Sequence, residues 1–285
     1  MRLALLALLL LAIGLAAVWA AMAWQFSRDV DALSVRVLGP PAAAGVPPHT
    51  PQLNGLLSRE SAVPDGAVAL RLRQRGEMRF GPTERWLPFE AEQLISLTKP
   101  AFLWDASVSM LPLIPVRVID AFDGESGLLD ARLGAAFPVS RVAGGDADAG
   151  ELMRYLAELA WAPGALTRNA ALTFEVLSPS HVRVTATAAG APVTIDLELA
   201  PNGDIVAASA AARGMTVGGE VRPTPWGGAY SGWTMIDGLY LPRRAEVSWR
   251  PPEGAWVYWR GEILSVEILD ASGQAMAPRQ PPPRG

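Results

Sequence analysis

The sequence predicts an α+β chain that is mostly β, with one long antiparallel sheet of about ten strands, two or three helices and an N-terminal transmembrane helix. Three observations lead to this prediction. The first 26 residues are almost wholly apolar, most of the remaining chain alternates between apolar and polar side chains, and tight-turn sequences separate the alternating runs. A sheet of this length has to curl, close on itself or pack against another layer.

The N-terminal segment is long enough to cross a membrane. Residues 3–26 carry no charge, and a helix of this length extends ~36 Å against ~30 Å of hydrocarbon. Trp19, Trp24 and Phe26 lie at its far end, as aromatic residues do at a membrane surface. A signal peptide cleaved near residues 21–23 is the alternative, but its apolar core would be shorter. We expect a single-pass anchor in the inner (cytoplasmic) membrane, with the C-terminal domain extracytoplasmic.

The rest of the chain divides into three parts. Residues 27–51 are interpreted as a proline-rich spacer, because "GPPAAAGVPPHTP" (39–51) holds five prolines and no charge. Residues 52–272 are expected to form one domain. Residues 273–285, which end in "PPPRG", are expected to form a disordered tail, because proline cannot pair within a sheet.

The predicted strands are short runs with a period of two. Turn sequences such as "PNG" (201–203) and "PPEG" (251–254) separate them, which indicates an antiparallel meander. The runs are residues 68–72, 102–110, 116–122, 128–133, 171–177, 181–188, 193–200, 204–212, 230–236, 239–249 and 255–269.

Two or three helices interrupt the strands. Residues 89–98 follow Pro88, carry acids in the first turn and stop before Pro100, which predicts a helix. Residues 52–60 are predicted as a short one. The clearest covers residues 148–160, with Asp146 or Asp148 as its cap and Pro163-Gly164 as its end.

The helix at 148–160 has two faces, and two interpretations of it stay open. The apolar face consists of Leu152, Met153, Leu156, Leu159 and Ala160, and the polar face of Glu151, Arg154, Tyr155 and Glu158. In the first interpretation the apolar face covers the sheet and the polar face is solvated. In the second the helix is a lid over a cavity, with Arg154 and Tyr155 at the rim, where they meet a ligand head group or a partner. Both place the charged pairs in solvent, so Arg154→Ala should hardly change stability.

Several classes of function are excluded or disfavoured by composition. The chain has no cysteine, two distant histidines and a net charge of −4, which leaves no thiolate chemistry, no histidine metal pair and no basic surface for nucleic acid. No nucleotide-binding or nucleophile-elbow motif is present. "DADAGE" (146–151) departs from a calcium loop at its fifth and sixth positions. We therefore expect no cofactor, no metal and no enzymatic activity, because no catalytic set of residues can be named.

Four segments of the sequence resemble one known family, and a fifth segment resembles a second. "RWLPFEAEQ" (85–93), "FLWDASVSM" (102–110), "GELMRYLAELAWAPGAL" (150–166) and "VYWRGEI" (257–263) resemble a prokaryotic family of membrane-anchored proteins of unknown function. "DGLYLPRRAEVSWRPPEGAWVYWRGEI" (237–263) is similar to the closing strands of the outer-membrane lipoprotein carrier (LolA-like) superfamily. The second resemblance implies a single curved sheet, a half-barrel, with the helices on its concave face and acyl chains bound there.

Tryptophan is abundant in the predicted domain, and again two interpretations stay open. The tryptophans either fill the interior of a wide sheet or line an apolar cavity whose rim carries arginines. The candidate ligand-binding residues under the second interpretation are Trp104, Arg117, Arg154, Tyr155, Trp161, Trp249, Trp259 and Arg260.

The sequence therefore favours a membrane-anchored, extracytoplasmic, non-enzymatic binder or carrier of a lipid or other apolar ligand. The alternative is a scaffold or partner-binding domain with a solid core and no ligand. Its protein partner is unknown, and the charged side of the 148–160 helix would be its contact surface.

Overall fold

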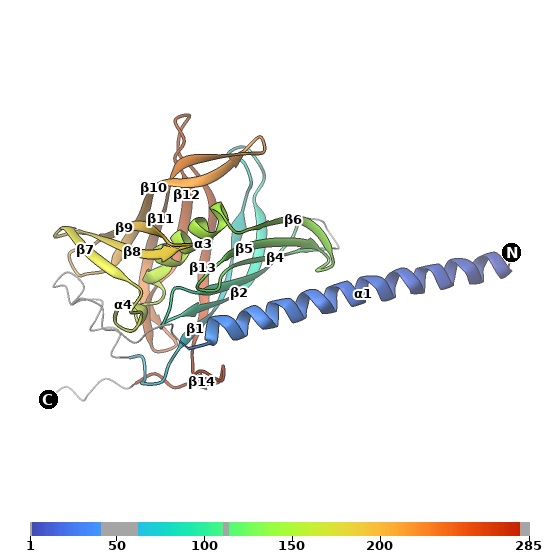
Figure 1. Cartoon of the computed structure of the whole chain (residues 1–285), viewed down its shortest axis with the longest axis horizontal. Coiled ribbons are helices and arrows are strands. Elements are labelled where there is room, and N and C mark those ends of the chain that lie inside the picture. Colours follow the sequence, from blue (N-terminus) through green and yellow to red (C-terminus); the bar gives the residue numbers. More distant parts are fainter. Residues whose placement is uncertain (1, 41–61, 111–113, 280–285) are drawn as a thin grey trace.

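A computed structural model of the chain describes residues 2–40, 62–110 and 114–279. It consists of one curved antiparallel sheet, with short helices on its concave side and one long helix that extends away from it (Figure 1). The predicted fold class, a mostly β half-barrel with an apolar N-terminal helix, is confirmed.

The sheet holds more strands than the sequence predicts. Its order is β6-β5-β4-β3-β2-β1-β13-β12-β11-β10-β9-β8-β7, and β14 pairs beside this path with β13. The strands are β1 (Ala69–Met78), β2 (Leu87–Ser96), β3 (Phe102–Val108), β4 (Val116–Phe122), β5 (Gly127–Leu133), β6 (Phe137–Ala143), β7 (Thr173–Ser178), β8 (His181–Ala188), β9 (Ala191–Leu199), β10 (Ile205–Val217), β11 (Glu220–Ile236), β12 (Leu239–Trp249), β13 (Trp256–Leu269) and β14 (Ala275–Met276).

The two ends of the domain meet in the middle of the sheet. β1 pairs with β13, with Ala69 opposite Leu269. Every other neighbouring pair along the path is consecutive in sequence, so the two edges are β6 and β7. The connection between these edges carries α3 (Asp146–Ala157), the 3-10 turn η2 (Glu158–Ala160) and α4 (Ala165–Arg168). This connection runs across the open, concave side of the half-barrel.

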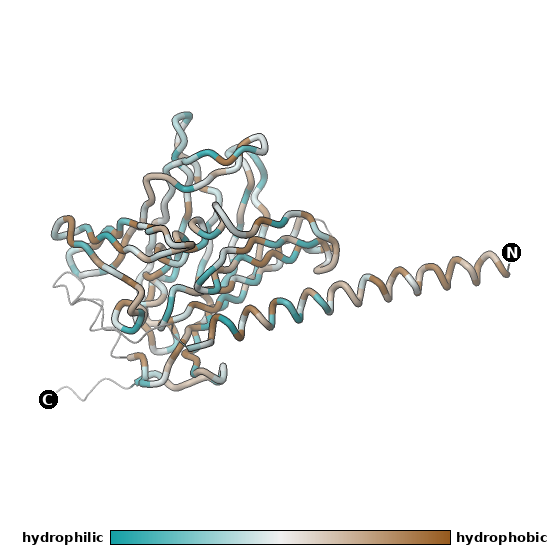
Figure 2. The backbone as a smooth tube through the Cα atoms, viewed as in Figure 1, coloured by the Kyte–Doolittle hydropathy of each residue, from teal (hydrophilic) through white to brown (hydrophobic). Residues whose placement is uncertain are grey.

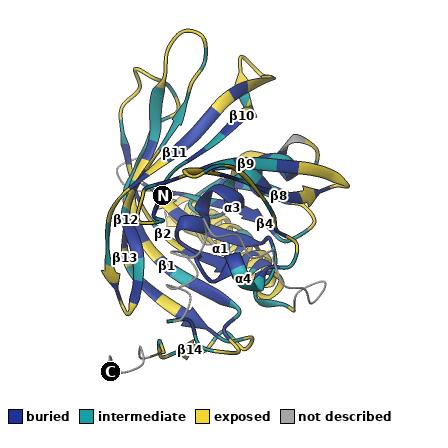
Figure 3. Ribbon diagram, turned by 90° about the vertical axis from the view of Figure 1, so that its left-hand side faces the viewer, coloured by how far each residue is buried: buried dark blue, intermediate teal, exposed yellow. Residues whose placement is uncertain are grey.

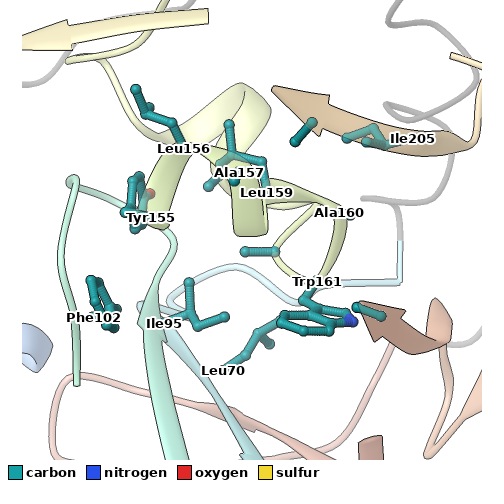
Figure 4. Close-up of a cluster of buried hydrophobic side chains, with 14 of the residues drawn as sticks. Leu70, Ile95, Phe102, Tyr155, Leu156, Ala157, Leu159, Ala160, Trp161 and Ile205 are labelled. Atoms are coloured by element: carbon teal, nitrogen blue, oxygen red, sulfur yellow. The ribbon is translucent and has the colours of Figure 1, made fainter. Parts of the chain in front are cut away.

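The concave side is filled by this connection. Figure 3 shows α3 as a buried helix enclosed by the sheet. Leu152, Leu156 and Leu159 have no exposed surface, and their cluster continues through Leu70, Ile95 and Trp161 of the surrounding elements (Figure 4). The predicted helix and its apolar face are confirmed. Its predicted cap is wrong, because Gly145 occupies the N-cap position and Asp148 accepts a hydrogen bond from the Gly127 amide at 2.7 Å.

The predicted helix at 89–98 is wrong, because residues 87–96 form strand β2. Side chains alternate in burial from Leu87 to Gln93, with Glu90 and Glu92 exposed between them. β2 pairs along its length with β1 on one side and with β3 on the other. First-turn acids and a preceding proline are weak signals for a helix, and tertiary pairing overrides them here.

The long helix α1 (Arg2–Leu38) packs against the outer, convex face of the sheet only with its C-terminal part. The buried positions Phe26, Val30, Leu33 and Val37 follow one helical stripe and contact a second core cluster, while the apolar N-terminal part contacts little. One 18-residue window of α1 has a mean hydropathy of 2.7 and is 0% buried, which makes the helix a candidate membrane span (Figure 2).

Two boundary expectations change with this arrangement. Residues 27–38, placed in the spacer by the sequence, continue α1 as helix because their apolar stripe packs on the sheet. Residues 275–276 of the expected tail form β14. The predicted helix at 52–60 lies outside the described residues.

The docking of α1 on the sheet predicts a specific stability effect. Leu33→Ala should lower the free energy of unfolding by about 2–3 kcal/mol, because Leu33 is buried between α1 and the sheet. Val35→Ala, at a position 69% exposed on the same helix, should leave it within about 0.5 kcal/mol. Denaturation of the full chain in detergent measures both, and equal effects of the two substitutions would contradict the docked arrangement.

Candidate functional site

A buried network of polar side chains lies between α3 and the concave face of the sheet. Arg154 Nε donates to Glu158 at 2.8 Å, and the same guanidinium pairs with Asp120 of β4. On its other side, Glu158 accepts a hydrogen bond from Gln93 at 2.5 Å. The network continues to β1 and β3. Gln74 Nε2 donates to Gln93 Oε1 at 2.7 Å, and the Trp104 indole N–H donates to Gln74 Oε1 at 2.9 Å.

The polar face of α3 is therefore buried, and the expectation that it faces solvent or a rim is wrong. Glu151 and Glu158 are 6% and 8% exposed, and Tyr155 is fully buried. The Tyr155 hydroxyl donates to the Ser96 carbonyl at 3.0 Å and accepts from Asn169 at 2.9 Å. The charges are tolerated in this position because the opposite flanks of the half-barrel supply their partners.

Glu151 has the most perturbed carboxyl group of this network. Glu151 Oε2 and Asp120 Oδ1 are both buried, and neither has a hydrogen-bond partner in the described chain. Burial, followed by the repulsion of Asp120, raises the pKa of Glu151 well above its usual value, although Arg213 at 3.6 Å opposes the shift.

The four candidate tryptophans lie in or against the packed core. The Trp161 indole donates to the Pro242 carbonyl at 3.0 Å, and Trp259 stacks on Phe89 with ring centroids 5.4 Å apart. Trp104 is 2% exposed, and Trp249, which is partly buried, stacks on Tyr258. In the described structure these rings fill the interior, as the first of the two interpretations has it.

The three candidate arginines do not form one rim. Arg154 lies on the concave side, with its guanidinium over the rings of Phe102 and Trp104. Arg117 lies on the outer face, where it pairs with Asp105 at 2.7 Å and stacks near Phe26 of α1. Arg260 pairs with Glu77 and covers the ring of Trp86, 4.4 Å from its centroid.

A groove of about 850 Å³ lies between α1 and the outer face of the sheet, and we call it the α1 groove. Its side-chain lining falls into an apolar and a polar group. The apolar group is Trp19, Ile114, Pro115, Leu133, Phe137 and Leu264. The polar group is Arg73, Glu90, Glu92, Asp105, Ser107 and Arg117.

The α1 groove has an apolar end around Trp19 and a charged end, where Leu264 of β13 lies beside Arg73. At one end the Trp19 indole donates to the Gly134 carbonyl at 3.0 Å, and a Cβ on Gly134 would lie 3.3 Å from Ile114. Further along α1, toward its C-terminus, the Arg117 guanidinium donates to Ser27 Oγ at 2.9 Å. Because Trp19 belongs to the apolar part of α1, the apolar end is the one nearer the candidate membrane span.

A second hollow of about 980 Å³ adjoins the α1 groove on the outer face, where Glu90 and Ser107 line both and charges of both signs line the second. They include Arg75, Glu262, Arg260 and Glu77, which are already paired with one another in two ion pairs. Within residues 2–40, 62–110 and 114–279, no three histidine, aspartate or glutamate side chains gather closely enough to hold a metal ion.

The α1 groove was not predicted from the sequence, although the sequence contains the apolar stripe of α1 that packs beside it. The stripe Phe26, Val30, Leu33 and Val37 has helical spacing and continues past the apolar segment, which indicates a helix with a partner. The sequence does not identify that partner, because the strands that line the groove, β1 to β6 and β13, come from seven separate segments of the chain.

The structure is a half-barrel domain with an apolar N-terminal helix and a groove on its outer face. The chain belongs to DUF6920, described as a family of unknown function, whose model matches residues 61–267. The family resemblance expected from the sequence is thus confirmed. A comparison with curated proteins finds no match.

Solved structures with a related chain trace include a LolA superfamily protein from Nitrosomonas europaea, with a TM-score of 0.42, 11% identity, and 75% of this chain and 92% of that chain covered. An outer membrane lipoprotein-sorting protein domain from Vibrio parahaemolyticus has a TM-score of 0.33, 8% identity and coverages of 76% and 91%. A beta-barrel-like DUF1849 protein from Brucella abortus has a TM-score of 0.22, 9% identity and coverages of 72% and 99%. At these scores the likeness says nothing about what this chain binds.

The burial of Arg154 predicts that its removal destabilises the domain. Arg154→Ala leaves Asp120 and Glu158 without their buried cation and should lower the free energy of unfolding by about 3–5 kcal/mol. Arg183→Ala removes an exposed ion pair with Asp196 and should cost at most about 1 kcal/mol. Chemical denaturation distinguishes them. An Arg154→Ala chain as stable as the wild type would show that the polar face of α3 is solvated after all.

The raised pKa of Glu151 predicts a pH dependence of stability. The folded chain binds the proton more tightly than the unfolded chain, so stability is lost as pH rises from the usual range of glutamate toward the raised value. Glu151→Gln should make this decline shallower, by at most about 1.4 kcal/mol per pH unit. Glu198→Gln, at an exposed position, should keep the wild-type slope. Unfolding measured from pH 4 to pH 9 tests this, and a Glu151→Gln slope equal to that of the wild type would contradict the raised pKa of Glu151.

Proposed function

We propose that this chain is a membrane-anchored, extracytoplasmic domain that binds the acyl part of a lipid in the α1 groove, without catalysing a reaction. The observation that carries the proposal is the groove itself, because its apolar end lies beside Trp19 of the candidate membrane span. A lipid in the adjacent leaflet reaches this end without crossing water.

The size and lining of the groove support a lipid. Its volume of about 850 Å³ falls in the range of small-molecule sites, roughly 300–1,000 Å³. Burying ten methylenes contributes ~8 kcal/mol at ~0.8 kcal/mol each, before the costs of ordering the chain are subtracted. Ile114 and Phe137 are 45% and 51% exposed, so the groove presents large apolar side chains that no other described segment covers.

The location proposed here differs from the one expected from the sequence. The space under α3 is occupied by Leu152, Tyr155 and Leu156, all fully buried, so an acyl chain on the concave side would have to displace the core. The outer groove needs no such displacement. The helix that anchors the domain also forms one wall of the site.

A packed concave core also fits the alternative of a scaffold domain without a ligand. That alternative used the charged side of α3 as its contact surface, and Arg154, Glu151 and Glu158 are buried in the described structure. It therefore requires a different contact surface. We retain it as the conclusion to be drawn if the lipid experiment fails.

Ile114→Asp tests the proposed function. The full chain, extracted in mild detergent, should carry bound phospholipid in native mass spectra. Ile114→Asp places a charge at the apolar end of the groove and should lower the bound fraction at least about tenfold, since an uncompensated charge against an acyl chain costs more than 1.4 kcal/mol.

Val221→Asp is the matched control, because it replaces a β-branched residue that is 48% exposed on β11, outside the groove. It should keep the bound lipid, and both variants should have the melting temperature of the wild type. A wild-type chain that is consistently free of lipid, or equal loss in the two variants, would contradict the proposed function.

A further inference from the structure

The charged end of the α1 groove contains one cation and one anion without ion-pair partners. Arg73 of β1 and Glu90 of β2 are both exposed, and neither makes an ion pair within the described chain. The other charges at this end are neutralised. Asp105 pairs with Arg117 at 2.7 Å, and Glu92 pairs with Arg71 at 3.3 Å.

The strand register makes Arg73 a diagonal neighbour of Glu90, while Arg75, directly opposite Glu90, pairs with Glu262. Arg73 lies opposite Glu92, and Glu90 is two residues from Glu92 on the same face of β2. Such diagonal neighbours on adjacent antiparallel strands are roughly 7–8 Å apart at the backbone, within reach of two long side chains. A ligand group at this end therefore meets a guanidinium and a carboxylate side by side.

The apolar and charged ends of the groove are arranged in the same direction as the acyl chains and headgroup of a phospholipid in the adjacent leaflet. Glu90 is level with Ser107 and Arg117 across the sheet, as the pairing of β2 with β3 and of β3 with β4 shows. These positions lie beyond the apolar end at Trp19, on the side away from the candidate span. An acyl chain against Ile114 thus leaves its headgroup at Arg73 and Glu90.

We infer that the lipid bound in the α1 groove is a zwitterionic phospholipid with a primary ammonium, the phosphatidylethanolamine class. The inference rests on the proposed function. The guanidinium of Arg73 binds the phosphate through charge-assisted hydrogen bonds, and the ammonium donates to the carboxylate of Glu90. A phosphatidylglycerol headgroup leaves Glu90 facing an anion. A choline headgroup has no N–H to donate to that carboxylate.

Headgroup competition tests the inference. The full chain is reconstituted in nanodiscs with equal amounts of phosphatidylethanolamine, phosphatidylcholine and phosphatidylglycerol of identical chains, then extracted gently for native mass spectrometry. The wild type should carry phosphatidylethanolamine at about threefold or more over either competitor, the size expected of one exposed ion pair. Glu90→Gln should remove this preference and keep the total lipid. Arg73→Gln should lower the occupancy of all three lipids.

Glu253→Gln and Arg222→Gln, at exposed positions outside the groove, are the matched controls and should behave as the wild type. Bound lipid without headgroup preference, a preference for either competitor, or a preference that survives Glu90→Gln would overturn the inference and leave the proposed function intact. A wild-type chain that carries no lipid in these discs would instead overturn the proposed function, and the inference with it.

Discussion

The pairing of β1 with β13 is the constraint on which the rest of the structure depends. It joins the two ends of the domain at the centre of the sheet, so the free edges become β6 and β7, which are neighbours in sequence. The segment between those edges crosses the concave side, where α3 lies with both of its faces buried. The concave side is thereby closed, and the convex side remains for α1.

The closed concave side explains the unusual chemistry of α3. Its charged residues meet β4 through Asp120 and β10 through Arg213, so the helix is held by ion pairs from both flanks of the sheet. Buried ion pairs of this kind add little net stability over apolar packing, but they penalise any other register of the helix. The network therefore positions α3, and the concave side, which α3 fills, leaves the outer face as the place for the proposed lipid site.

Much of the fold could be predicted from the sequence, while the site could not. Residues 116–122, 181–188 and 239–249 were predicted as strands to within a residue of their bounds, because their alternation follows the pleat and their turns are explicit. β2 was missed because Pro88 and the following acids imitate a helix start. The prediction that the polar face of α3 is solvated was wrong. The helical spacing of polar residues does not show whether they face solvent or buried residues of opposite charge. The α1 groove depends on which strands lie beneath α1, and no local pattern contains that information.

The most direct test of this account is to map where a membrane lipid touches the domain. A phospholipid with a photoreactive group at mid-chain, irradiated with the full chain in a bilayer, labels the residues that the acyl chain contacts. The account predicts labelled peptides that contain Ile114 and Phe137, in addition to the span itself. Label on the α3 segment, or no label anywhere outside α1, would contradict it, because the ligand would then lie on the concave side or nowhere in the domain.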